Sequence, residues 1–227
     1  MVRFFHVARA YGAREVLADV TLSLGGEPAV IAGPAGAGKS VLLRLMCGLE
    51  APTRGWITVD GLPLAPTASD VLAAHRRRLA IVPQHSLLIE DRSVIQNVAL
   101  ALELQEAFLG EVHERAGEAL ARVGIAGLAD RSAGSLSAGE RRLVCLARAL
   151  ARDDSKLLIA DEPAAGLDPV GRQRVGRLLA EQAAQGATVI VASQEPGLLG
   201  LGEHRVLFLE QGRVAWDSSG AAASEAS

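Results

Sequence analysis

A glycine-rich run directly after a short apolar stretch constrains this chain more than any other feature of its sequence. The apolar stretch is Ala29–Ala32, and residues 33–40 then read Gly-Pro-Ala-Gly-Ala-Gly-Lys-Ser. A wholly apolar run of this length is typical of a buried parallel strand. Residues 41–47, which are apolar except for Arg44, predict a helix that ends at Gly48. A strand, a glycine-rich turn and a helix in this order predict a loop that binds phosphate.

The residue types in this loop have distinct chemical uses. Glycine lets the backbone fold tightly, so that successive N–H groups point at phosphate oxygens. Lys39 can reach the β- and γ-phosphates, and the Ser40 hydroxyl can ligate Mg²⁺. A turn that contains Gly-Lys-Ser by coincidence is the alternative, which the strand and helix around it disfavour. We therefore expect ATP and Mg²⁺ as ligands, bound by Gly33, Pro34, Ala35, Gly36, Ala37, Gly38, Lys39, Ser40 and Val41.

Two adjacent carboxylates, Asp161 and Glu162, follow a second apolar run at residues 157–160. A buried strand has no structural use for adjacent acids, because unpaired buried charge is costly. In isolation such a pair is more often the start of a solvated loop. Beside a phosphate loop, Asp161 can hold the Mg²⁺ shell, and Glu162 can orient and polarise the attacking water.

Strand and helix patterns alternate along the chain and predict an α/β layered fold with a helical insertion from about residue 94 to residue 150. The closing strands flank residues 210–212, a plausible hairpin turn. We expect strands at 4–7, 20–24, 29–32, 57–61, 79–82, 156–160, 188–192, 205–209 and 213–216, with helices at 41–47, 111–123, 139–152 and 169–185.

Composition excludes several classes of protein. A net charge of -3 and a pI near 6.0 give no basic footprint, so nucleic acid is not an expected partner. No apolar run approaches the roughly 18 residues that span a bilayer, and the first residues do not read as a signal peptide. Cys47 and Cys145 lie in apolar, helical contexts, so a disulfide is not expected. The five histidines show no metal-ligand spacing. These features fit a cytoplasmic protein.

From about residue 3 to residue 216 the sequence resembles the ATP-binding cassette (ABC) ATPases. The most specific element is Leu-Ser-Ala-Gly-Glu at 136–140, similar to the family signature L-S-G-G-Q/E and placed before the acidic strand. Gln84 matches the Q-loop glutamine, Gly-Leu-Asp at 166–168 matches the D-loop, and Tyr11 stands where the family has an adenine-stacking ring. Alone, Tyr11 reads as a packed aromatic, Gln84 as a surface residue, and 136–140 as a helix cap with Glu140 at its third position.

The resemblance implies a P-loop NTPase fold, with a RecA-like core, an antiparallel β subdomain and a helical subdomain. It implies one domain over 1–217, in which 1–84 and 151–217 form the nucleotide-binding core and 85–150 the helical subdomain. The Ser- and Ala-rich tail, 218–227, is expected to be disordered.

The resemblance also implies site roles and partners. Gln84 would sense the γ-phosphate and Mg²⁺. Two subunits would pair head to tail, so that the signature of one completes the ATP site of the other, and an integral membrane subunit would hold the pair at the inner face of the membrane. Nucleotide contacts are then expected from Tyr11, Ser137, Ala138, Gly139 and Asp168.

Within the family, Asp91–Ala99 and Leu42–Glu50 resemble segments of the cell-division ATPase FtsE, which implies an FtsX-like membrane partner. Lipoprotein-releasing and macrolide-exporting ATPases share much of this likeness and are the alternative. A weakly hydrolysing nucleotide-sensing scaffold is an alternative of another class. Leu87 and Leu88 lie where the family receives its membrane subunit, although core packing explains their apolar character equally well.

The sequence departs from the family pattern at several positions. Gln194 stands where the family has a histidine that contacts the γ-phosphate, and an amide cannot carry its positive charge. Ala138 replaces the first glycine of the signature, Leu143 replaces an arginine, and Val41 replaces a Thr or Ser. We hypothesise intact ATP binding with slow hydrolysis, since losing ~2–3 kcal/mol of transition-state stabilisation slows a reaction ~30- to 150-fold.

Overall fold

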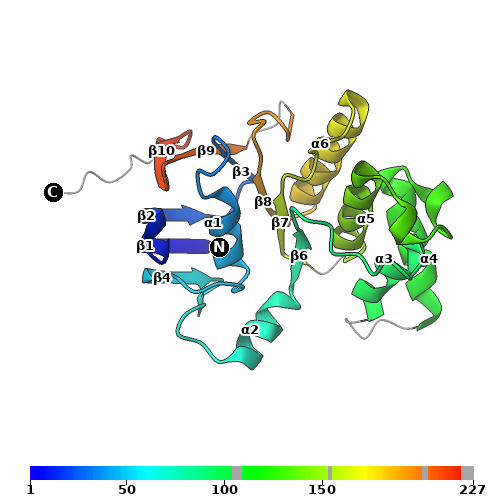
Figure 1. Cartoon of the computed structure of the whole chain (residues 1–227), viewed down its shortest axis with the longest axis horizontal. Coiled ribbons are helices and arrows are strands. Elements are labelled where there is room, and N and C mark those ends of the chain that lie inside the picture. Colours follow the sequence, from blue (N-terminus) through cyan, green and yellow to red (C-terminus); the bar gives the residue numbers. More distant parts are fainter. Residues whose placement is uncertain (104–108, 153–154, 201–203, 221–227) are drawn as a thin grey trace.

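The computed structural model describes residues 1–103, 109–152, 155–200 and 204–220. Its central element is a six-stranded sheet with the order β10-β9-β3-β8-β7-β6 (Figure 1). Neighbouring strands from β9 to β6 are parallel, and β10 pairs with β9 in the antiparallel sense. The strands are β3 (Ala29–Ala32), β6 (Leu79–Val82), β7 (Leu157–Asp161), β8 (Thr188–Ala192), β9 (Arg205–Glu210) and β10 (Arg213–Asp217).

A separate four-stranded antiparallel sheet, ordered β2-β1-β4-β5, lies on one side of the parallel sheet. Helix α1 (Lys39–Met46) packs between the two sheets, and its apolar residues join one buried cluster with side chains of both (Figure 1). This packing holds the start of α1 next to the end of β3. The strands are β1 (Val2–Tyr11), β2 (Arg14–Leu24), β4 (Arg54–Val59) and β5 (Leu62–Pro63).

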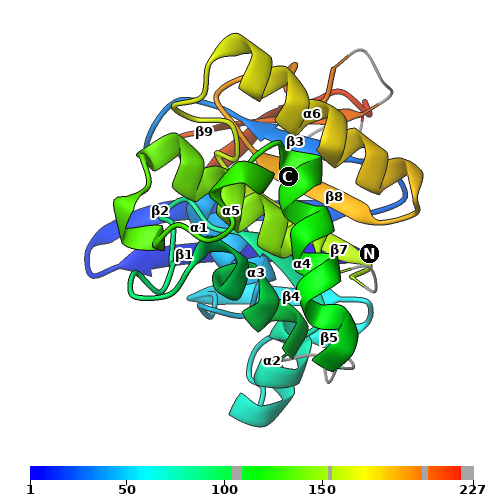
Figure 2. The same ribbon diagram turned by 90° about the vertical axis from the view of Figure 1, so that its right-hand side faces the viewer.

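Helices cover the opposite face of the parallel sheet, as Figure 2 shows. Helix α5 carries apolar residues on one face and buries them against the sheet and the neighbouring helices, which places residues 136–140 at its start. The helices on this side are α3 (Val94–Glu103), α4 (Leu109–Val123), α5 (Ala138–Leu150) and α6 (Pro169–Ala184), with short 3-10 turns at Ala126–Leu128 and Ala133–Ser135.

The structure has strands at 29–32, 79–82 and 188–192 with the bounds expected from the sequence. These bounds could be predicted because a fully buried parallel strand is a nearly unbroken apolar run. Strands β1 and β2 are longer than expected, since they continue as a paired ribbon beyond their apolar residues. Strand β5 and helix α2 (Ser69–Arg76) were not predicted. The expected helical stretch from 94 to 150 is interrupted between α4 and α5 by turns.

The hairpin turn after Glu210 is confirmed, with Gln211 at φ 47° and Gly212 at φ 76°. Ser218 remains tied to β9, because its backbone N–H donates to the Val206 carbonyl and its hydroxyl accepts from the Val206 N–H. Residues 221–227 of the tail lie outside the described residues. Cys47 and Cys145 are buried free thiols. In the part of the chain that the structure describes, no helix has the length and apolar character needed to cross a bilayer.

Candidate functional site

The glycine-rich loop lies between β3 and α1, and two of its glycines are required by the backbone. Gly33 has φ 143°, and a Cβ at this position would lie 2.1 Å from the carbonyl oxygen of Leu209 on β9. Gly38, the residue before α1, has φ 105°, where a Cβ would lie 3.0 Å from the Val16 carbonyl oxygen. Both φ values are costly for any residue with a side chain. The loop therefore packs closely between β9 and β2 and leaves the N-terminus of α1 open.

Lys39 lies across this loop. The residue is 7% exposed, and its ammonium donates to the carbonyl oxygens of Gly33 at 2.7 Å and Pro34 at 3.0 Å. Its charge is thus held by two neutral acceptors on its own loop. A phosphate oxygen is a stronger, charged acceptor for the same group.

A pocket of about 450 Å³ opens at the carboxyl ends of the parallel strands, beside this loop. Ligands of open α/β sheets bind at this edge. Gln84 lies two residues after β6, Glu162 directly after β7, and Gln194 two residues after β8. The structure therefore brings together residues that are far apart in the sequence. The pocket is lined by Tyr11, Arg14, Val16, Ala35, Gly36, Gly38, Lys39, Ser40, Val41, Gln84, Glu162 and Gln194.

Arg14 and Val16 line the pocket but were not singled out from the sequence. Both belong to the start of β2, which returns from a tight turn after Tyr11. An arginine three residues after the candidate adenine-stacking ring is the signal that could have found this cation.

Asp161 has the properties of a cation ligand. It ends β7, is 9% exposed, and forms a hydrogen bond with the Ser40 side chain. Its Oδ1 is buried without a hydrogen-bond partner among the described residues. Burial raises the pKa of Asp161 above its ordinary value, although the Ser40 hydrogen bond and nearby cations act in the opposite sense. A buried carboxylate oxygen beside a serine hydroxyl fits Mg²⁺, which prefers oxygen ligands.

Glu162 has a backbone conformation that is uncommon for a residue with a side chain, at φ 48°. Two neighbouring elements hold it there. Its N–H donates to the Ala192 carbonyl of β8 at 2.9 Å, and its carbonyl accepts a hydrogen bond from the Arg142 guanidinium on α5. The main chain is fixed on both sides, and the residue lines the pocket. This arrangement can present a carboxylate to a water molecule beside the γ-phosphate.

The loop after β8 places Gln194 in the same pocket. The Ser193 N–H donates to the Ile31 carbonyl at 3.1 Å, and the Ser193 hydroxyl accepts from the Glu195 N–H at 3.0 Å. These bonds anchor the residues on either side of Gln194 to β3 and to each other. A neutral amide thus stands at the pocket.

Tyr11 is 42% exposed and lines the pocket at the end of β1. The Arg9 guanidinium carbon lies 4.6 Å from the centre of its ring, and its hydroxyl donates to Glu50. Arg44 also donates to Glu50, at 2.6 Å. Burial alone would raise the pKa of Glu50, but the hydrogen bonds from Tyr11 and Arg44 and the charges of Arg44 and Arg9 lower it. The ring is therefore fixed in place with Arg9 over one of its faces, and the adenine-stacking role of Tyr11 stays a prediction.

The signature run and the candidate D-loop do not line this pocket. The helix-cap interpretation of 136–140 is confirmed, because Ser137 caps α5 and the Glu140 carboxylate accepts from the Ser137 N–H at 2.7 Å. Asp168 caps α6 by accepting from the Gly171 N–H at 2.7 Å. A Cβ on Gly139 would lie 3.2 Å from the Leu167 side chain, so the two motifs adjoin each other. The nucleotide roles of Ser137, Ala138, Gly139 and Asp168 stay predictions.

Comparison with known proteins adds three findings. The model of the ABC transporter family matches residues 17–165. The glutamate/aspartate import ATP-binding protein GltL of Escherichia coli K12 is 35% identical over 220 residues, covering 96% of this chain and 90% of GltL. The cell-division ATP-binding protein FtsE of the same strain is 35% identical over 216 residues, covering 94% of this chain and 97% of FtsE.

A solved structure resembles most of the chain. It is a dimeric ATP-binding cassette in a post-hydrolysis state with ADP and Pi, which superposes with a TM-score of 0.88 at 29% identity. The match covers 96% of this chain and 97% of that one.

Proposed function

Because this chain belongs to the ABC transporter family and is an ATPase, we propose that two copies pair head to tail around ATP and drive an integral membrane partner. The observation that carries this proposal is the incomplete pocket. The phosphate loop, Gln84, Glu162 and Gln194 line it, whereas the signature run at 136–140 does not. A second copy could supply the missing signature, and the similar cassette solved with ADP and Pi is dimeric.

The residues of one chain divide the work of hydrolysis. The loop N–H groups and Lys39 bind the β- and γ-phosphates, and Glu162 polarises the attacking water. Ser40, Gln84 and Asp161 would hold Mg²⁺, which neutralises phosphate charge when it is bound. Ser137 and Gly139 of the second copy would complete the donors around the γ-phosphate. In this arrangement dimer formation and ATP binding are coupled, because each nucleotide contacts both copies.

The membrane partner is proposed to dock on the loop between β6 and α3. The side chain of Asn97, a fully buried residue, fixes this loop by accepting from the Ile89 N–H at 2.8 Å and donating to the Ile89 carbonyl at 3.0 Å. The Arg148 guanidinium donates to the Leu87 carbonyl at 2.9 Å. With the backbone held, Leu87 is 72% exposed and Ile89 41% exposed. Exposed apolar side chains on a fixed loop near Gln84 suit a partner that senses the ATP site.

We propose an FtsX-like protein of the division machinery as this partner, on the likeness of Asp91–Ala99 to FtsE. The likeness includes Asn97, the residue that fixes the docking loop. A solute permease is the second candidate, because GltL is as similar to this chain as FtsE is. In either case the ATPase cycle would be the same, and the partner would decide what is moved.

Purification of the chain from its own membranes tests both parts of the proposal. We expect an integral membrane protein to co-purify in a fixed ratio, and Leu87→Asp to lower its recovery several-fold. Leu49→Asp is the matched control, since Leu49 is 55% exposed elsewhere on the surface. Recovery of an FtsX-like protein supports the division role. Recovery of a solute permease would instead support a role in import. Unchanged recovery with Leu87→Asp would remove this loop from the interface.

A further inference from the structure

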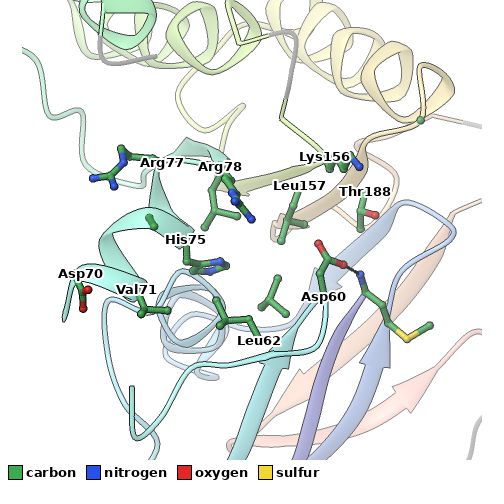
Figure 3. Close-up of a pocket in the computed structure, with 15 residues that line it drawn as sticks. Asp60, Leu62, Asp70, Val71, His75, Arg77, Arg78, Lys156, Leu157 and Thr188 are labelled. Atoms are coloured by element: carbon green, nitrogen blue, oxygen red, sulfur yellow. Dashed lines mark hydrogen bonds and ion pairs between the residues drawn. The ribbon is translucent and has the colours of Figure 1, made fainter. Parts of the chain in front are cut away.

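A second, larger cavity lies at the opposite edge of the parallel sheet from the ATP pocket. Its volume is about 1080 Å³, and its walls come from α2, the turn between β4 and β5, and the first residues of β6, β7 and β8 (Figure 3). Binding pockets for small molecules commonly have ~300–1000 Å³. Each of β6, β7 and β8 thus begins at this cavity and ends beside the phosphate loop.

The cavity carries more cationic than acidic side chains that are available to a ligand. Arg77, Arg78 and Lys156 line it, and none of the three side chains has an ion pair or hydrogen bond within the described residues. Of the two lining carboxylates, Asp60 is already paired with the amino group of Met1. In Figure 3, Arg78 reaches over His75 toward Leu157, Lys156 lies beyond Leu157 near Thr188, and Arg77 and Asp70 lie at the outer edge.

The wall that carries Arg78 is held in place by the core of the protein. The Arg152 guanidinium donates to the carbonyl of Leu79 at 2.8 Å and to that of Arg77. His75 is 6% exposed, and its Nε2 lies 3.0 Å from the Met46 carbonyl oxygen of α1. His75 is therefore engaged by the fold, and Arg78 and Lys156 are left to meet a ligand.

The remaining surface of the cavity is largely aliphatic. This mixture distinguishes the cavity from the ATP pocket, where glycine N–H groups and a helix N-terminus bind phosphate. Cationic side chains above an aliphatic floor suit a ligand with an anionic group and an apolar body, because each part then has its own contact. The aliphatic residues that line it are Leu62, Val71 and Ala74, which are part-exposed, and Val59, Leu79 and Leu157, which are almost fully buried.

We propose that this cavity, called here the amino-edge cavity, is a binding site for an amphipathic organic anion, with its phosphate or carboxylate on Arg78 and Lys156. Nothing in the catalytic scheme uses these two residues. A soluble phosphorylated compound and the headgroup of an anionic lipid both have the required chemistry, and experiment separates them.

The sequence itself provides a selective probe of this site. It contains two lysines, Lys39 in the phosphate loop and Lys156 in the amino-edge cavity. Pyridoxal phosphate and pyridoxal share an aldehyde and a ring but differ in the phosphate. Reduction of their lysine adducts with borohydride and peptide mass spectrometry report each lysine separately. ATP is present throughout, so that Lys39 is protected and the lysine label reports on Lys156.

We divide each labelling rate of Lys156 by the rate at which the same aldehyde labels free Nα-acetyllysine. After this correction, pyridoxal phosphate should label Lys156 about tenfold faster than pyridoxal does. One charge-assisted contact between the phosphate and the protein would produce this difference. Arg78→Gln should remove most of this preference, and Arg177→Gln, a surface arginine on α6, should keep it. Thermal unfolding of each variant confirms that it is folded. Equal labelling by the two aldehydes, or a preference that survives Arg78→Gln, would overturn the proposal.

Competition identifies the source of the anion. Hexyl phosphate should protect Lys156 from labelling, whereas hexanol should not. Protection by phosphatidylglycerol vesicles and not by hexyl phosphate assigns the site to a lipid headgroup. If neither anion protects Lys156 better than hexanol or phosphatidylcholine vesicles do, no amphipathic anion binds there.

Discussion

The two ends of strands β6, β7 and β8 differ in how they recognise a ligand. At the carboxyl ends, a pocket of about 450 Å³ is formed by the phosphate loop, the carboxylate residue Glu162 and the two amide residues Gln84 and Gln194. At the amino ends, a cavity of about 1080 Å³ is formed by cationic and aliphatic side chains. The smaller volume of the pocket beside the phosphate loop fits the proposed head-to-tail pairing, in which one chain contains half of the ATP site. Cavity size therefore does not identify the active site of this protein.

The two ends also differ in the free-energy cost of burying the charges that they contain. Asp161, at the carboxyl end of β7, is buried with an unpaired oxygen and a raised pKa. Asp60, at the amino edge, is exposed and paired with an amino group. Buried unpaired charge is retained where it has a use. This contrast predicts that changes at the carboxyl edge alter turnover strongly and that matched changes elsewhere do not.

Glu162→Gln has the largest expected effect. Loss of a positioned general base lowers turnover ~10²- to 10⁴-fold, while the phosphate loop still binds ATP. Steady-state ATPase measurements and size-exclusion chromatography with ATP should show an inactive chain trapped as a dimer. Glu181→Gln, the matched change on α6, should keep wild-type turnover. Turnover that survives Glu162→Gln would take Glu162 out of the base role.

Gln194→His has the second largest expected effect, and in the opposite direction. A histidine can carry positive charge toward the γ-phosphate, and ~2–3 kcal/mol of added stabilisation raises turnover ~30- to 150-fold. Single-turnover ATP hydrolysis by the wild type and the variant measures this gain. The hypothesis of slow hydrolysis is lost if the wild type is already fast and histidine leaves it unchanged.

The effect of Asp161→Asn on thermal stability is the smallest of these effects and the most diagnostic. The pKa of Asp161 is higher in the folded chain than in the unfolded chain. Between these two pKa values the folded chain therefore holds more protons. The free energy of unfolding consequently falls as the pH rises through that window. At pH 7 without Mg²⁺, the variant should unfold at a higher temperature, by roughly 2–4 °C for each kcal/mol recovered. Its ATPase activity should be lost.

Asp60→Asn is the control for this prediction at the other edge. Asp60 and its partner are both more than half exposed, so removing this pair should leave the melting temperature almost unchanged. Calorimetry from pH 4 to pH 8 compares the two variants. A melting temperature that falls in Asp161→Asn would show that the buried carboxylate stabilises the empty site.

Much of the site could be predicted from the sequence because its signals are local. The phosphate loop joins a strand and a helix that are adjacent in the chain, and the cap of α5 needs only Ser137 and Glu140. Asp161 ends a buried strand, and Glu162 follows it directly. Arg14 lies only three residues after Tyr11, but the pairing of β1 with β2 is what brings it to the pocket, and the sequence analysis did not single it out. The bond from Arg142 to the Glu162 carbonyl joins residues of different elements and has no sequence signal.

By itself, the sequence predicted a phosphate loop that binds ATP and resembled the ABC ATPases, because each motif is a short run of residues. The comparisons with known proteins confirm that family. Tertiary structure alone decided which distant residues share a surface. The order β9-β3-β8-β7-β6 places Gln84, Glu162 and Gln194 around one pocket. It also places Arg78 and Lys156 at the other end of the same strands. The physical reason is that strand order and register are fixed by burial of the whole sheet, which no local run of residues specifies.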